Sequence, residues 1–208
     1  MSYFYGGIFT SFAEADTVRS ATYKYYSISL PQQVLIKPQT LLILRESVHG
    51  NLPGRAIQNI DEVRSFFAQN QNRFDYLEKK LELLQPREQV SILANTDIFI
   101  GVLGSGFANV IYMLPGSVAI SFSPPNVGGL FFNTVSEFAR VHYLGVYNSS
   151  VPFPPECRNR VNANGESVIR SCLDLLYASD IFIDLHQLDP LMDSAVIHLR
   201  SEKYWKSL

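Results

Sequence analysis

The 208-residue sequence has little of what marks several common classes of protein. Lysine and arginine number 17 against 19 aspartates and glutamates, so the cationic surplus typical of nucleic-acid-binding proteins is missing. No run of 18 or more apolar residues is present, so the sequence predicts no membrane-spanning helix. Its start, MSYFYGGIFTSFAEAD, lacks the basic segment that opens a signal peptide. The composition therefore indicates an ordinary globular chain with no nucleic-acid partner.

Cysteine is also scarce. The two cysteines, Cys157 and Cys172, can pair in an oxidising compartment, but two free thiols in a reducing compartment are equally ordinary. The sequence NSS at Asn148 fits the acceptor pattern for N-glycosylation, which often occurs by chance. Composition alone leaves the compartment open.

What the chain does have is an alternation of apolar runs with helical patterns. Strands are expected over 40–45, 73–78, 97–102, 117–123 and 142–147, and helices over 9–26, 59–67, 86–94, 106–114, 130–140, 167–178 and 190–205. The first helix is indicated by Phe12, Ala15, Val18 and Arg19. This alternation predicts a parallel, Rossmann-like α/β sheet with flanking helices.

Local signals support two of the helix starts. Asn59 followed by Glu62 has the spacing of a capping box. Pro86 suits the first position of the next helix. Asp180 and Asp184, in SDIFIDL, resemble the solvated flank of a strand.

The stretch TDIFIGVLGSGFANV joins an expected strand to an expected helix through three glycines. Gly101, Gly104 and Gly106 permit positive φ angles and a close approach of the backbone to a ligand. The free amides and the positive dipole end near Ser105 and Gly106 favour an anion. Alternatively, the glycines only permit a tight turn, with Ser105 as the N-cap. Both interpretations are open at this point.

Familiar cofactor motifs do not fit this turn. Its G-x-x-G-x-G spacing reverses the dinucleotide fingerprint, and no acid follows about 20 residues later. No GK[ST] follows it, which excludes a Walker A loop. The histidines lack metal-ligand spacing, and no catalytic triad is legible. We therefore expect neither a bound cofactor nor a metal.

Two arginines lie near the same expected edge. Ligands of open α/β sheets sit beyond the carboxyl ends of the strands. Arg45 ends one expected strand, Arg55 lies across the following loop, and Ser121 lies towards the end of another strand. An arginine there either pairs with a carboxylate such as Glu46 or binds an anion. Two arginines beside an anion-type turn make these alternatives about equal.

Three ordered segments resemble the glycosyltransferase family 61 domain. They are ILRESVHGNLPGRAIQN, PREQVSILANTDIFIGVLGSGFANVIYMLPGS and VAISFSP, and the similarity spans 33–147. It implies the C-terminal, donor-binding half of a GT-B fold over 37–208, with 1–36 as a hinge helix and connector and a missing N-terminal domain. It also implies inverting, metal-independent transfer from a nucleotide sugar, commonly UDP-linked, to a glycan or glycoprotein.

The resemblance also assigns site residues. The donor diphosphate would contact Arg45, Arg55, Gly104, Ser105, Gly106 and Asn109. The nucleoside or sugar would contact Glu88, Gln89, Leu103 and Ser121. No residue is identified as the catalytic base.

The sequence departs from the family pattern at two of these positions. Leu103 replaces a histidine and Ser121 replaces an acid. A catalytically impaired pseudoenzyme or binding module is therefore one alternative, and an unrelated α/β enzyme acting on a phosphorylated metabolite is another. The resemblance further implies an endoplasmic reticulum or Golgi lumen, where Asn148 would be glycosylated and Cys157 would pair with Cys172.

Overall fold

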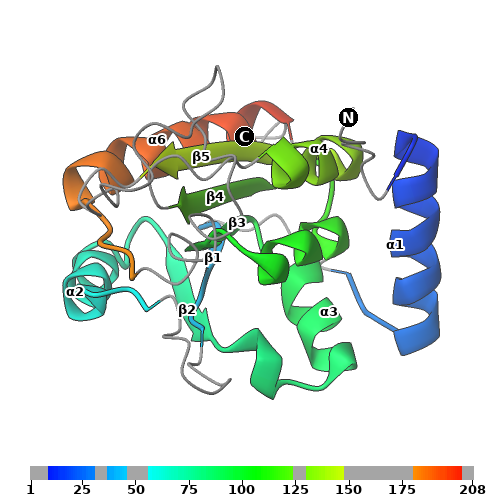
Figure 1. The fold of residues 1–208 in the computed structure, drawn as a ribbon, viewed down its shortest axis with the longest axis horizontal. Coiled ribbons are helices and arrows are strands. Elements are labelled where there is room, and N and C mark those ends of the chain that lie inside the picture. Colours follow the sequence, from blue (N-terminus) through cyan, green and yellow to red (C-terminus); the bar gives the residue numbers. More distant parts are fainter. Residues whose placement is uncertain (1–8, 31–36, 46–55, 124–129, 148–179, 203–208) are drawn as a thin grey trace, which may run out of the picture.

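The computed structural model describes residues 9–30, 37–45, 56–123, 130–147 and 180–202. At its centre is a five-stranded parallel sheet in the order β2-β1-β3-β4-β5 (Figure 1). The strands are β1 (Gln39–Ile43), β2 (Asp75–Lys79), β3 (Ile98–Val102), β4 (Val118–Ser123) and β5 (His142–Tyr147). The predicted Rossmann-like α/β fold is confirmed.

The buried strands follow directly from the apolar runs. Every residue of β3 and of β4 is buried. Continuous burial is typical of parallel strands that are covered on both faces, because no face is left for water. The edge strand β2 is only partly buried, and its sequence accordingly mixes charged and apolar residues.

Helices cover both faces of the sheet (Figure 1). One face carries α2 (Ile60–Gln69) and α6 (Leu185–Glu202), which bury Phe67 and Met192 against the strands. The other face carries α3 (Pro86–Ala94), the 3₁₀ helix η2 (Ser105–Tyr112) and α4 (Leu130–Ala139). A second 3₁₀ turn, η1 (Leu81–Leu83), connects β2 to α3. No helix in these described ranges is long and apolar enough to cross a membrane.

The first helix, α1 (Phe12–Tyr26), is the outermost element on the α3, η2 and α4 side (Figure 1). It is held there by Arg19, which is only 4% exposed. Its guanidinium donates to the carbonyl oxygens of Met113 and Ala139, at 3.3 and 3.1 Å, and pairs with Asp16. Asp16 also pairs with Arg140. The expected hinge role of residues 1–36 stays a prediction.

The expected capping box at Asn59 is wrong. The helix does begin at Ile60, but the Asn59 side chain makes no hydrogen bond to the helix backbone. Its amide instead pairs with both backbone groups of Ile183, at 2.8 and 2.9 Å, and donates to Glu62. The Asn59 side chain thus bonds to Ile183, far along the chain, instead of to the first turn of its own helix.

The segment before α6 makes a short strand-like contact, with the half-buried Asp180 and Asp184 at its two ends. Ile181 pairs with Ile57 in an isolated parallel bridge, and Asp180 accepts a hydrogen bond from the Ala56 amide. Asp184 accepts from the His186 amide at the start of α6. That helix therefore begins at Leu185, before the predicted start at Pro190. The helix expected over 167–178 lies outside the described residues.

Candidate functional site

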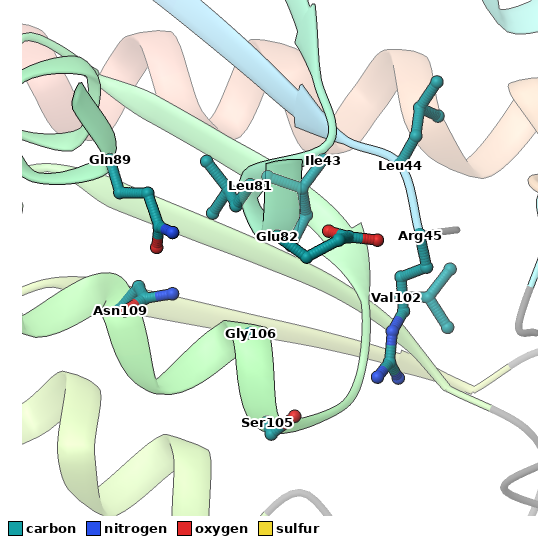
Figure 2. Close-up of a pocket in the computed structure, with 10 residues that line it drawn as sticks. All are labelled: Ile43, Leu44, Arg45, Leu81, Glu82, Gln89, Val102, Ser105, Gly106 and Asn109. Carbon is teal, nitrogen blue, oxygen red and sulfur yellow. The ribbon is translucent and has the colours of Figure 1, made fainter. Parts of the chain in front are cut away.

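The strand order places a crevice between β1 and β3. The chain leaves β1 towards β2 on one side and β3 towards β4 on the other, so the connections diverge at this point. Ligands of open α/β sheets bind at such a switch point, beyond the carboxyl ends of the strands. A cavity of about 370 Å³ lies there (Figure 2). Its lining residues are Ile43, Leu44, Arg45, Leu81, Glu82, Gln89, Val102, Ser105, Gly106 and Asn109.

The β1 side of the cavity supplies its cation. The Leu44 amide donates to the Lys79 carbonyl oxygen at 2.9 Å, which extends the pairing of β1 with β2 beyond the strand ends. Arg45 follows directly, and its guanidinium extends towards Ser105 (Figure 2). Among the described residues, Arg45 has no hydrogen-bond or ion-pair partner. This side chain is therefore a permanent charge aimed into a cavity and available to an anion.

The glycine turn forms the opposite wall, and its glycines do not use the positive φ angles that glycine permits. In the described part of the chain the glycine with positive φ is Gly116, at 81°, whereas Gly104 is extended, at 167°. Gly101 is required for space: a Cβ there would lie 2.4 Å from Cγ1 of Ile43. The absent side chain lets β3 and β1 pack closely beneath the cavity.

The element after the turn is a 3₁₀ helix with Gly104 as its N-cap, not the expected α-helix capped by Ser105. Phe107 holds η2 in place. Its backbone amide donates to the Gly104 carbonyl oxygen at 2.8 Å, and its buried ring packs against the ring of Phe99 with 4.8 Å between the ring centroids. The amides of Ser105 and Gly106 have no backbone acceptor within the described residues. Both residues line the cavity, so these amides are available to an anion there.

Polar side chains from η1, α3 and η2 line the remainder of the cavity. Glu82 contributes a carboxylate, and the amides of Gln89 and Asn109 lie near each other at one end (Figure 2). The Gln89 amide nitrogen donates to the Leu84 carbonyl oxygen at 3.0 Å, which leaves its oxygen as an acceptor. Glu88 does not line the cavity, because its carboxylate caps α3 by accepting from the Gln85 amide.

Two further predicted contact residues are buried. Leu103 and Ser121 are both 0% exposed and do not line the cavity. The hydroxyls of Ser121 and Tyr143 share a hydrogen bond of 2.6 Å, and burial raises the pKa of Tyr143. The assignment of Leu103 and Ser121 to the donor stays a prediction.

The structure thus brings together Arg45, Gln89, Ser105, Gly106 and Asn109 from the predicted set. Gly104 does not line the cavity and is the N-cap of η2. Four predicted residues lie outside the described ranges: Arg55, Asn148, Cys157 and Cys172.

Glu82 is the polar cavity residue that sequence reasoning missed. It lies in KKLELL, where strand and helix patterns compete, and so no position relative to the sheet could be read there. A signal did exist, because Glu82 closely follows the carboxyl end of β2, the edge at which ligands bind.

A polar cavity at the switch point of a parallel α/β sheet is the kind of site that binds nucleotides. Residues 10–120, more than half of the chain, match the family model described as Glycosyltransferase 61. The chain belongs to the glycosyltransferase 61 family, and its function is glycosyltransferase-like. The matched range contains all the cavity-lining residues and ends one position before Ser121. No protein of curated function matches the chain.

Proposed function

We propose that the cavity binds the diphosphate of a nucleotide-sugar donor, UDP-linked, for transfer of the sugar to a hydroxyl of a glycan or glycoprotein. One observation carries the proposal. Within the part of the chain that the structure describes, the Arg45 guanidinium has no partner and the amides of Ser105 and Gly106 have no backbone acceptor, and these groups line the same cavity at the β1–β3 switch point. Guanidinium and amide donors suit diphosphate oxygens, and this arrangement occurs in a glycosyltransferase 61 chain.

In the proposed sugar transfer, the main task of this cavity is to stabilise the departing diphosphate. The acceptor oxygen forms a bond to the anomeric carbon while the bond from that carbon to the diphosphate oxygen breaks, with inversion. The acceptor proton passes to a base, and negative charge gathers on the departing diphosphate. Fixed donors aimed at developing charge are typically worth about 2.7–4 kcal/mol each. Arg45 and the two amides supply such donors without a metal ion.

The size of the cavity favours a shared donor site. Ligand pockets typically measure about 300–1,000 Å³. At about 370 Å³ this cavity is at the small end of that range and accommodates part of a nucleotide sugar. The remainder, and the acceptor, would contact the N-terminal domain that the family resemblance implies. The same resemblance supports a location in the lumen of the secretory pathway, where Asn148 would be glycosylated. Treatment of native protein with an N-glycosidase tests this location, because removal of a glycan from Asn148 would lower the mass of the protein.

Ligand competition tests the proposed donor. Isothermal titration of the chain with UDP is expected to show weak binding. Inorganic phosphate, pyrophosphate and simple sugar phosphates are expected to bind with lower affinity than UDP. Weak binding is expected because an incomplete cleft is less preorganised. Equal or tighter binding of a sugar phosphate would favour the alternative of an α/β enzyme acting on a phosphorylated metabolite.

Donor binding with little turnover is a second candidate, favoured by Leu103 and Ser121. Both are fully buried, and neither provides the polar group that the resemblance expects at its position. Loss of one acid–base or electrostatic contribution costs about 10²–10³-fold in rate. Two measurements separate the candidates: the affinity of the chain for UDP and the rate at which it releases UDP from UDP-sugars. An active transferase predicts both binding and release, whereas impaired turnover predicts binding without release.

A further inference from the structure

We propose that Arg19 is a positioning residue for the donor site, because it holds η2 in the place where the amides of Ser105 and Gly106 face the cavity. The inference rests on the proposed function, since it assumes that these amides receive the donor diphosphate. It goes beyond that function because Arg19 and the rest of α1 do not line the cavity, and the family resemblance assigned no residue of α1 to the donor.

The helix η2 depends on its surroundings for support. All eight of its residues, Ser105–Tyr112, have the 3₁₀ form. A 3₁₀ helix has poorer hydrogen-bond geometry than an α-helix, and runs longer than about three or four residues are uncommon. At a rise of about 2.0 Å per residue, eight residues span about 16 Å. The first turn of η2 therefore lines the cavity, whereas its last turn lies away from the cavity and is held by other contacts.

Side chains of α1 cap this last turn. The final carbonyl oxygens of a helix have no partner within the helix itself. Here a guanidinium nitrogen of Arg19 donates to the carbonyl oxygens of Ile111, at 3.4 Å, and Met113, at 3.3 Å. The Tyr23 hydroxyl donates to the carbonyl oxygen of Tyr112, which lies between them in the chain, at 2.6 Å. Three successive carbonyl groups at the end of η2 are thus bound by two side chains of a helix distant in sequence.

Arg19 is itself held from several sides. It is almost completely buried, and it pairs with Asp16 of its own helix. Its guanidinium also donates to the Ala139 carbonyl oxygen at the end of α4, at 3.1 Å. Asp16 in turn pairs with Arg140. A side chain with so many partners has little freedom to rotate, so it fixes the position of the carbonyl groups that it binds.

The charge of Arg19 is also compatible with an anion at the other end of η2. The carbonyl end of a helix carries partial negative charge, which a nearby cation stabilises. The amide end carries partial positive charge, which favours an anion. A neutral side chain at position 19 would therefore remove both the hydrogen bonds and the charge that support η2. We expect the Ser105 and Gly106 amides to lose part of their alignment with the diphosphate as a result.

The test uses the whole 208-residue chain and two variants of α1, Arg19→Met and Tyr23→Phe. Tyr26→Phe is the matched control for Tyr23→Phe, because the Tyr26 hydroxyl makes no hydrogen bond to η2 in the described structure. Met192→Ala is the control for stability. It opens a cavity in the core on the opposite face of the sheet, away from η2.

Two properties are measured at a temperature at which urea unfolding shows each protein to be folded. Isothermal titration gives the affinity for UDP. Nuclear magnetic resonance gives the chemical shifts of the Ser105 and Gly106 amides without any ligand. A loss of stability alone does not move these two amides, so the second measurement separates positioning from a purely structural role.

Arg19→Met is expected to weaken UDP binding about 5–10-fold, part of the value of a charge-assisted hydrogen bond, and to shift both amide resonances. Tyr23→Phe should weaken binding about 2–3-fold with smaller shifts. Both controls should keep the affinity of the unaltered chain within about twofold.

Unchanged UDP affinity in Arg19→Met would overturn the inference, and so would an equal loss in Met192→Ala. If Arg19→Met does not fold, the comparison of Tyr23→Phe with Tyr26→Phe decides in the same way. If the unaltered chain binds no UDP, the proposed function fails instead. The chemical shifts of the Ser105 and Gly106 amides then decide by themselves whether Arg19 positions η2.

Discussion

Gly101 and Ile43 are paired across β3 and β1, and the space that a side chain at position 101 would need is filled by Ile43. A Cβ on Gly101 would lie 2.4 Å from Cγ1 and 2.9 Å from Cδ1 of Ile43. Ile43 in turn lines the cavity. The floor of the site thus depends on a glycine between two buried strands.

Gly101→Ala is therefore expected to destabilise the fold by about 1–3 kcal/mol, the usual cost of overpacking a core. Gly106→Ala is the matched control, because a Cβ there would meet Cδ1 of Ile43 at an ordinary 3.7 Å. Urea unfolding of both variants measures the difference. Equal stability of the two variants would show that Ile43 moves aside without cost.

Asp16 is expected to make stability fall in acid. A hydrogen bond from Arg140 is the main cause that lowers the pKa of Asp16 below its ordinary value of 3.8, and Arg19 adds to it. Because the folded-state pKa is depressed, this stabilisation is complete above the unfolded-state pKa. It is lost as the pH falls through the folded-state pKa.

The free energy of unfolding should therefore fall below about pH 4, and Asp16→Asn should fall less steeply while being less stable at pH 7. Asp61→Asn is the control, since the Asp61 carboxylate is 90% exposed beside Arg64. Urea titrations at pH 7 and pH 3 make the comparison. Parallel losses in all three proteins would exclude this role for Asp16.

Leu103 is expected to act through packing. It is fully buried in the core formed with η2 and α4. Leu103→Ala should cost about 2–5 kcal/mol, and the volume-conserving Leu103→Met less than about 1.5 kcal/mol. UDP affinity should be the same in Leu103→Met as in the unaltered chain. A tenfold change in affinity at unchanged stability would mean that this side chain contacts the donor.

The Ser121–Tyr143 pair is expected to behave as one unit. Removing the Tyr143 hydroxyl leaves the fully buried Ser121 hydroxyl without this partner, which costs about 1–3 kcal/mol, and removing the Ser121 hydroxyl costs less because Tyr143 is only half-buried. The double variant Ser121→Ala/Tyr143→Phe should lose clearly less than the sum of the single variants. A double-mutant cycle by chemical denaturation measures this. Additive losses would argue against a coupled hydrogen bond.

The sheet could be predicted because its strands are apolar runs that must be covered on both faces. The helix over 9–26 was also predicted, but its buried face was not. Phe12 and Val18 are 48% and 41% exposed, whereas Ala15 and Arg19 are buried. Arg19 is buried because carbonyl oxygens far along the chain, at Met113 and Ala139, receive its guanidinium. Spacing within one helix contains no information about such partners.

In the candidate site, too, local features could be predicted from the sequence, whereas features that depend on distant parts of the chain could not. Arg45, Ser105 and Gly106 were predicted because a strand end and a glycine turn are local features. Glu82 was not predicted, because its place in the cavity depends on β2 pairing with β1 and on the η1 turn that follows. Glu88 matched the motif but caps its own helix, which its position in the first turn also favours.

Arg45 is the cation that we propose receives the donor diphosphate, and the assignment of the cavity to the donor depends most on this residue. Isothermal titration of UDP into the unaltered chain, Arg45→Ala and Arg87→Ala tests it most directly. Arg87 is an exposed arginine of α3 outside the cavity, so its loss changes the net charge equally. We predict that Arg45→Ala weakens UDP binding by about 1.5–3 kcal/mol and that Arg87→Ala changes it by less than about 0.5 kcal/mol. UDP binding that is equal in the two variants would contradict the assignment of this cavity to the donor.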